Sequence, residues 1–394
     1  MRGGDSLTII LTGGGTAGHV LPHVALLPFL RQKFASIYYI GGVNKSEREI
    51  IEGEGVKFFS LECVKLRRGL NLKNALKNLA IPMGFAKSVS GAGKILDELR
   101  PDIVFSKGGF VALPVVRAAA KRNIPVVAHE SDATIGLANR LSIKSCVKVC
   151  TTFKGVTEKY GNDGKSAFIH TGSPIRQKIY NGKPDIAIKR HHLAVAARKT
   201  EDRQIMLRKL LVLGGSLGAA RINLAVLEAL PDLLKKYDII HVCGRGKAPT
   251  AVHGFASDSA GNGVLGRYIP LEYVDDIENY LAWADIVASR AGSNALCELM
   301  VLGKPTLFIP LSSGRGDQVY NVAELQKDSG SGAVGAAAVL NEKDLSPDSL
   351  YKTLERLWEN KGKYSGNARK TIVDGTKDIF DTIYGVVCQI YNTR

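Results

Sequence analysis

Short apolar runs alternate along the chain with stretches whose apolar residues recur at helical spacing. Runs that stay apolar at every position are typical of strands buried on both faces of a parallel sheet. In the first half of the chain these runs cover residues 7–11, 36–41, 56–61, 102–109, 124–129 and 147–153. With amphipathic stretches between most of them, the pattern predicts a doubly wound α/β domain.

The alternation lapses between about residues 174 and 206, where the sequence is polar and strongly basic. It restarts at "LLVLGGSLGAARINLAVLEAL" and continues through apolar runs at 238–244, 284–290 and 305–311. The 394 residues also exceed the size at which one core stops growing, about 250–300 residues. We therefore predict Rossmann-like domains at 1–175 and 207–374, joined by a basic connection at 176–206. The stretch 369–392 is expected to be helical, and the sequence leaves open whether a helix at about 375–394 packs back on the first domain.

Composition narrows the class of protein and of partner. Hydrophobic residues make up 45% and charged residues 23% of the chain, as in soluble globular proteins. The net charge of +16 favours an acidic partner: nucleic acid, an anionic membrane surface or a phosphorylated substrate. The six cysteines lack zinc-ligand spacing, so we expect reduced thiols. No signal peptide or membrane span is recognisable, so we expect an intracellular protein that meets a membrane only from its surface.

Each predicted domain opens with a strand, a glycine-rich turn and a helix, "LTGGGTAGHV" and "LVLGGSLGAA". Gly13, Gly15 and Gly18 match the dinucleotide fingerprint, but Ile40-Gly41-Gly42 stands where a nicotinamide site needs an acid. A P-loop is also disfavoured, because the Gly-Lys-Ser at 164–166 lacks its leading glycine. Glycines do let backbone N–H groups approach an anion at a helix start. The alternative is a tight turn that binds nothing, which is less attractive for two equivalent loops.

His19 stands at the start of the first helix, where the positive end of the helix dipole disfavours imidazolium. A neutral imidazole there is a candidate general base, although a single histidine is more often structural. Ligands of open α/β sheets bind beyond the carboxyl ends of the strands. We therefore expect the two domains to face each other across a cleft that holds the active site.

Five motifs occur in order along nearly the whole chain: "TGGGTAGH", "SKGGF", "HESDATIGLANR", "LGGSLGAAR" and "SRAGSNALCE" followed by "GDQ". In this the sequence resembles the MurG family of UDP-N-acetylglucosamine:N-acetylmuramyl-(pentapeptide) pyrophosphoryl-undecaprenol N-acetylglucosaminyltransferases. The resemblance implies a GT-B glycosyltransferase fold. It also implies inverting transfer of GlcNAc from UDP-GlcNAc to the C4 hydroxyl of MurNAc in lipid I, which gives lipid II. No cofactor or obligatory metal is implied.

The resemblance also assigns residues to the two substrates. Catalysis falls to His19, as base for the acceptor hydroxyl, and to Glu130. The acceptor side is assigned to Gly14, Gly15, Gly108 and Gly109, the last two near the lipid diphosphate. The UDP-GlcNAc set is Thr16, Ala17, Gly18, Asp132, Arg176, Ser216, Val274, Ser293, Asn294, Ala295, Leu296, Cys297, Glu298, Asp317 and Gln318. Within it, the Val274 backbone would read uracil, Glu298 would accept from the ribose hydroxyls, and Asp317 and Gln318, supported by Asn321, would hold the sugar.

One loop position and three acidic residues need separate interpretation. Ala17 stands where many family members have glycine, and Asp132 stands where many have asparagine, so a carboxylate that only accepts hydrogen bonds replaces an amide that also donates them. Asp275-Asp276 could suggest a metal site. We interpret Asp276 instead as the N-cap of a helix beginning at residue 277.

The stretch 64–89 mixes six lysines and arginines with leucine, isoleucine and phenylalanine. Such a surface suits anionic lipid, and the alternative is an ordinary domain helix with an inward apolar face. Nucleic-acid binding has no motif to support it. Three other functions stay open: a glycolipid synthase acting on diacylglycerol, a UDP-GlcNAc 2-epimerase, and a UDP-sugar-binding protein without catalysis.

Overall fold

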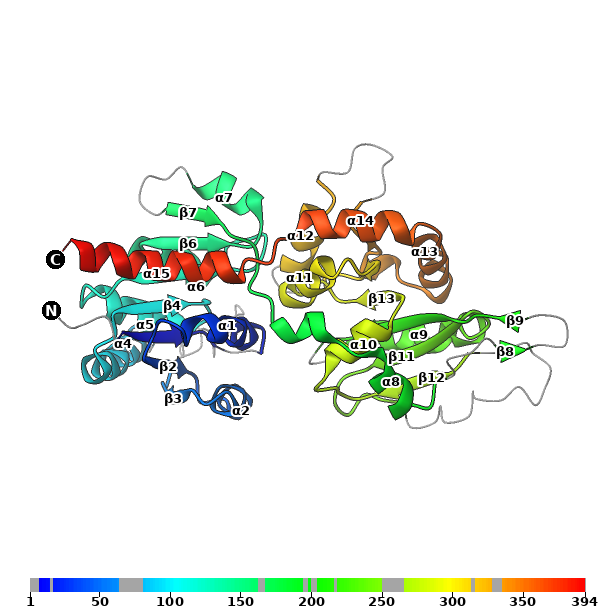
Figure 1. Ribbon diagram of the computed structural model, residues 1–394, viewed down its shortest axis with the longest axis horizontal. Coiled ribbons are helices and arrows are strands. Elements are labelled where there is room, and N and C mark those ends of the chain that lie inside the picture. The colour runs from blue at the N-terminus through cyan, green and yellow to red at the C-terminus, as the bar shows by residue number, and fades with distance from the viewer. Residues whose placement is uncertain are drawn as a thin grey trace. The chain divides into compact units, whose positions relative to one another are not determined.

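A computed structural model describes residues 7–14, 17–63, 81–161, 167–193, 198–199, 204–215, 218–249, 266–312, 316–327 and 335–393. The chain divides into two compact units (Figure 1). Unit 1 comprises Met1–Arg176 and Val373–Arg394, and unit 2 comprises Gln177–Ile372. The predicted sites Gly15, Thr16 and Ser216 and the stretch 64–80 lie outside the described residues, as does the side chain of Ala17.

Unit 1 contains a parallel seven-stranded sheet with the strand order β3-β2-β1-β4-β5-β6-β7. The order reverses between β1 and β4, so the loops that follow these two strands emerge side by side at the carboxyl edge. Its elements are β1 (Thr8–Thr12), α1 (Ala17–Leu30), β2 (Ser36–Gly41), α2 (Lys45–Gly53), β3 (Lys57–Ser60), α4 (Ile81–Leu99), β4 (Ile103–Ser106), α5 (Ala112–Ala120), β5 (Val126–Glu130), α6 (Leu137–Ser142), η1 (Ile143–Ser145), β6 (Lys148–Thr151), α7 (Lys154–Tyr160), β7 (Ala167–His170) and α15 (Thr376–Asn392).

Unit 2 repeats this plan with a parallel six-stranded sheet in the order β12-β11-β10-β13-β14-β15. Here the order reverses between β10 and β13. Its elements are η2 (Gln177–Asn181), α8 (Pro184–Arg190), β8 (Arg198–Lys199), β9 (Gln204–Ile205), β10 (Arg208–Leu213), α9 (Ala220–Leu233), β11 (Tyr237–Val242), β12 (Tyr268–Leu271), α10 (Ile277–Trp283), β13 (Ile286–Ser289), α11 (Ser293–Val301), β14 (Thr306–Phe308), α12 (Asp317–Glu324), β15 (Ala338–Val339), η3 (Glu342–Asp344), α13 (Pro347–Glu359) and α14 (Lys361–Thr371).

Each sheet buries alternating side chains against amphipathic helices. In unit 1, Ile9 and Leu11 of β1 pack in one cluster with α1 and with Ile379 and Ile383 of α15. In unit 2, the strands pack against α9 and against three leucines of α13. Because successive residues of a strand point to opposite faces, the fully buried Ile10 of β1 lies on the other face of its sheet. The predicted doubly wound α/β fold is therefore confirmed.

Two stretches differ from the sequence-based expectation. The interval from residue 176 to 206 is not a plain connection, because η2 and α8 within it are helical and both pack against α10 in unit 2. The helix expected at 369–392 is broken at residues 372–375, between α14 and α15. The second part, α15, packs against α1 of unit 1 (Figure 1).

Candidate active site

Two glycine segments lie in contact at the carboxyl edge of the unit 1 sheet. Gly14 follows β1 and Gly109 follows β4, and a Cβ on Gly109 would lie 2.5 Å from the carbonyl oxygen of Gly14. A Cβ on Gly14 would in turn lie 2.8 Å from Cγ2 of Val111. Gly109 also has φ +89°, a conformation that other residues rarely adopt. Both positions therefore require glycine, because a side chain at either one would collide with the neighbouring segment.

His19 lies in the first turn of α1 and is half-buried, and Gly18 beside it is exposed. One turn further along the helix, His23 is fully buried, with its ring 5.2 Å from that of Tyr39 and 5.5 Å from that of Phe105. Among the residues that the structure describes, none forms a hydrogen bond of good geometry with either ring nitrogen of His23. Burial, with the nearby charge of Lys107, holds the pKa of His23 well below its ordinary value, so this ring is neutral.

A buried lysine directly precedes the Gly108-Gly109 segment. Lys107 is 3% exposed, and its Nζ lies 2.5 Å from Oγ of Ser131 and 2.5 Å from Nδ1 of His129. The other ring nitrogen of His129 donates to the carbonyl oxygen of Gly172 at 3.0 Å. Burial, followed by the Lys107 charge, keeps the pKa of His129 low, so Nδ1 accepts from the ammonium. Lys107 and His129 lie within two of the sequence motifs, but the sequence alone assigned neither of them a role. The feature that could have indicated Lys107 is its position directly between a buried strand and two glycines.

Glu130 turns its carboxylate onto its own loop. Oε1 accepts from the backbone N–H groups of Ser131 and Asp132, at 3.0 and 3.2 Å. Oε2 accepts from the Gly136 N–H at 3.0 Å and from Nδ2 of Asn139 at 2.9 Å. Burial and the Asp132 charge raise the pKa of Glu130, while these hydrogen bonds oppose the shift. The carboxylate thus organises residues 131–136, which carry the half-buried Asp132, and its expected part in catalysis stays a prediction.

The glycine loop of unit 2 is equally constrained. Gly218 has φ +69°, and a Cβ there would lie 2.2 Å from the carbonyl oxygen of Cys243. The same carbonyl accepts from Nδ2 of Asn223 at 3.0 Å, which fixes the first turn of α9 against the end of β11. Ser216, the expected ligand of this loop, lies outside the described residues. Glycine is thus required for the turn itself, independently of any ligand.

Side chains of α12 form hydrogen bonds with the loop that leads into α11. Oε1 of Gln318 accepts from the backbone N–H of Ala291 at 3.2 Å and from that of Leu311 at 2.9 Å. Asn321, which is buried, donates from Nδ2 to the Ala291 carbonyl at 3.3 Å. Gln318 therefore holds two loops with its side-chain oxygen, and its expected contact with the sugar stays a prediction. Asn321 supports the same loop.

Ser293 to Glu298 form the first two turns of α11, after the N-cap Gly292. The backbone N–H groups at 293–295 point out of the helix end, because a helix offers them no carbonyl four residues back. Leu296 and Cys297 are completely buried, and the Leu296 N–H already bonds to the Gly292 carbonyl. The side chains of these two residues therefore pack inside unit 2, and the expected place of this helix start near the diphosphate stays a prediction. Glu298 is half-buried.

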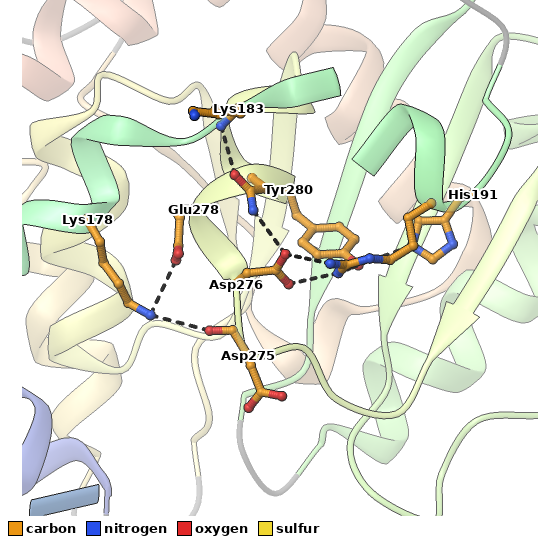
Figure 2. A network of polar contacts seen from close by, with 9 residues as sticks. Lys178, Lys183, His191, Asp275, Asp276, Glu278 and Tyr280 are labelled. Atoms are coloured by element: carbon orange, nitrogen blue, oxygen red, sulfur yellow. Dashed lines mark hydrogen bonds and ion pairs between the residues drawn. The ribbon is translucent and has the colours of Figure 1, made fainter. Parts of the chain in front are cut away.

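Val274 lies, half-buried, in the loop between β12 and α10, next to the acidic pair Asp275-Asp276. Asp276 occupies the N-cap position of α10, as expected, but its side chain makes no cap hydrogen bond. Its carboxylate instead bonds to Arg190 and Asn279 (Figure 2). Among the residues that the structure describes, no group of three or more acidic, histidine or cysteine side chains could hold a metal ion. Asp317 begins α12, and Arg176 is the last residue of unit 1 before η2.

Two family models match the chain. The N-terminal domain of glycosyltransferase family 28 matches residues 9–151, and the C-terminal domain of the same family matches residues 209–383. A curated protein of Lachnospira eligens is 40% identical over 366 residues, which cover 92% of this chain and 94% of that protein. It is named "UDP-N-acetylglucosamine--N-acetylmuramyl-(pentapeptide) pyrophosphoryl-undecaprenol N-acetylglucosamine transferase". A protein of the same name from Clostridium novyi is 39% identical over 373 residues, 94% of this chain and 96% of that one.

Solved structures share the fold. MurG of Acinetobacter baumannii superposes with a TM-score of 0.70 at 21% identity, over 96% of this chain and 99% of that chain. A UDP-GlcNAc 2-epimerase of Neisseria meningitidis, solved with UDP-GlcNAc bound, gives a TM-score of 0.59 at 13% identity over 98% of this chain and 99% of that one. The architecture is therefore of the GT-B type, which transferases and epimerases both use.

Proposed function

The chain belongs to glycosyltransferase family 28, and from this premise we propose that it transfers GlcNAc from UDP-GlcNAc to lipid I, giving lipid II for peptidoglycan synthesis. The observation that carries the proposal is the 40% identity, over more than nine-tenths of the chain, to proteins named for that reaction. The order of the two family domains along the chain agrees with it.

The acceptor is activated by a residue of unit 1. His19 removes the proton of the MurNAc C4 hydroxyl, and its place in the first turn of α1 favours the neutral imidazole that a base requires. The hydroxyl oxygen then forms a bond to C1 of GlcNAc while the bond from C1 to the UDP oxygen breaks, with inversion at C1. Gly14, Gly108 and Gly109 offer backbone to the lipid diphosphate, and the buried Lys107, next to Gly108 in the sequence, adds positive charge.

The donor is held by residues of unit 2. Glu298 accepts from the two ribose hydroxyls, the backbone of Val274 reads uracil, and Asp317 meets the sugar hydroxyls. The N–H groups at the start of α11 face the diphosphate, where helix-end dipoles stabilise the negative charge that develops on departing UDP. Gln318 contributes by holding the loop that enters α11. This arrangement supplies charge stabilisation from the chain's own groups.

We further propose that the enzyme works at an anionic membrane surface through the basic and apolar stretch 64–89. Of this stretch the structure describes residues 81–89 at the start of α4, where Met83 is 81% exposed and Lys87 is exposed. Within the described parts of the chain, no helix has the length and hydropathy needed to cross a bilayer. The net charge of +16 supports attraction to anionic lipid. Sedimentation with anionic and with neutral vesicles tests this: binding that is equal for both refutes it.

The whole-chain likeness to a UDP-GlcNAc 2-epimerase keeps that reaction as the second candidate. UDP release from UDP-GlcNAc, measured with and without a short-chain lipid I analogue, separates the two. Release that requires the acceptor and is abolished by His19→Ala is the expected result. Acceptor-independent conversion of UDP-GlcNAc would indicate the epimerase, and release only with diacylglycerol would indicate a glycolipid synthase.

A further inference from the structure

A polar network within unit 2 ties the segment 177–191 to the N-terminal end of α10 (Figure 2). Arg190, the last residue of α8, donates to both carboxylate oxygens of Asp276 at 2.9 Å each. The same guanidinium donates to the hydroxyl of Tyr280 at 2.9 Å. Nε2 of His191 lies 3.1 Å from that hydroxyl, within hydrogen-bond distance, and burial lowers the His191 pKa. Planar bidentate pairing fixes orientation as well as distance.

Residues nearer the start of the segment 177–191 also contact α10 and the loop before it. Nζ of Lys178 lies 3.4 Å from the backbone carbonyl of Asp275 and 3.6 Å from the carboxylate of Glu278 (Figure 2). The backbone N–H of Lys183 donates to Oδ1 of Asn279 at 2.8 Å, and Nδ2 of Asn279 donates to Asp276 at 2.9 Å. Asn279 is buried, so this link is shielded from solvent.

Close packing accompanies the polar contacts. A Cβ on Gly182 would lie 2.0 Å from the backbone carbonyl oxygen of Glu278, so the segment runs directly against α10 with no room for a side chain. The Arg190 guanidinium is the largest cause of the lowered pKa of Asp276. The pair is partly exposed, and such pairs alone add little to global stability. The role of the Arg190–Asp276 pair is therefore to be sought in the loop that it holds in position.

Asp275 and Asp276 directly follow Val274 in the loop 272–276, which we name the base-reading loop. Recognition of a base by a backbone N–H and carbonyl requires that the peptide be held to within about 0.5 Å. We propose that Arg190 and Lys178 are positioning residues for the nucleotide: they anchor the base-reading loop so that the Val274 backbone distinguishes uracil from other pyrimidines. This inference rests on the proposed function, because it takes the donor to be a uridine nucleotide.

The test titrates the full-length protein with UDP and with CDP by calorimetry. Arg190→Ala should raise the Kd for UDP about tenfold and reduce the preference for UDP over CDP, while kcat at saturating UDP-GlcNAc stays within about twofold of wild type. Arg190→Lys keeps the charge but loses the bidentate geometry and should give an intermediate Kd. If Arg190 acts through Asp276, adding Arg190→Ala to Asp276→Ala should change the Kd for UDP no further.

Arg122→Ala is the matched control. Arg122 makes a bidentate pair with Asp97 in unit 1, at 2.6 Å for both contacts, and this pair is also partly exposed to solvent. It should leave UDP binding unchanged. A folded Arg190→Ala variant that binds UDP and CDP like wild type would overturn the inference. If that variant does not fold, the same result with a folded Arg190→Lys variant would overturn it. A wild-type protein that binds no UDP would instead overturn the proposed function.

Discussion

Replacing Glu130 with glutamine removes a buried charge without changing the volume of the side chain. The carboxylate accepts four hydrogen bonds, two on each oxygen, from three backbone N–H groups and Asn139. A glutamine amide offers one oxygen and one NH₂ group, so whichever way it turns, its NH₂ group faces N–H donors. About two of the four hydrogen bonds are lost, and partly buried backbone N–H groups are left without acceptors.

The expected cost follows from these numbers. A hydrogen bond to a charged group contributes about 1.5–3 kcal/mol, so losing two costs about 3–6 kcal/mol. Burial raises the pKa of Glu130, which shows that the charge itself carries a desolvation cost that glutamine avoids. The net loss should therefore be about 3 kcal/mol. For a unit of this size, that lowers the unfolding midpoint by roughly 6–12 °C.

Thermal unfolding and amide hydrogen exchange test the prediction. Glu130→Gln should lower the midpoint and speed exchange of the amides at 131–136, whereas Glu158→Gln, an exposed glutamate of the same unit, should do neither. If Glu130→Gln keeps the wild-type midpoint and exchange but loses turnover, the reasoning is refuted. Glu130 would then act directly on the substrate, as the family resemblance implies.

Three further predictions follow from the described geometry. Burial holds the pKa of His241 at about 4. The unfolded chain binds this proton below about pH 6.5 and the native state does not, so stability should fall by about 1.4 kcal/mol per pH unit from about 6.5 to about 4. His241→Gln should make that slope shallower in urea unfolding, and an identical slope would contradict the assignment. Gly109→Ala should lower stability by about 2–3 kcal/mol, because its Cβ would meet Gly14 and φ is +89°, while Gly53→Ala, with open space around it, should not. Lys107→Met should raise KM for the lipid-linked acceptor about tenfold without changing the Kd for UDP; a change in UDP binding alone would refute its place on the acceptor side.

The hydrophobic pattern predicted most strands of both sheets, because a buried parallel strand leaves a continuous apolar run, but the predicted runs did not include β7, β12 or β15. The run 36–41 coincides with β2, and the run at 7–11 is offset by one residue from β1. The break between α14 and α15 was not predictable in this way. Residues 372–375 form it through contacts with residues near position 173, which are distant in the sequence.

The positions of the glycine loops were predictable, but the partners of the polar side chains were not. The bonds that Glu130 accepts are local, yet no sequence pattern indicated that its carboxylate turns back onto residues 131–136. The neutral state of His23 depends on Tyr39 and Phe105, which approach only when β2 and β4 flank β1. Arg190 meets Asp276 across a long interval of sequence, so the basic segment looked like a solvated connection.

The most direct test of the central claim is the structure of the product formed from UDP-GlcNAc and a short-chain lipid I analogue. NMR of the purified glycolipid reports both the position and the anomeric configuration of the new bond. We predict GlcNAc attached in β configuration to the C4 oxygen of MurNAc, formed by wild type and not by His19→Ala. An α linkage, attachment at another hydroxyl, or full product formation by His19→Ala would contradict the account.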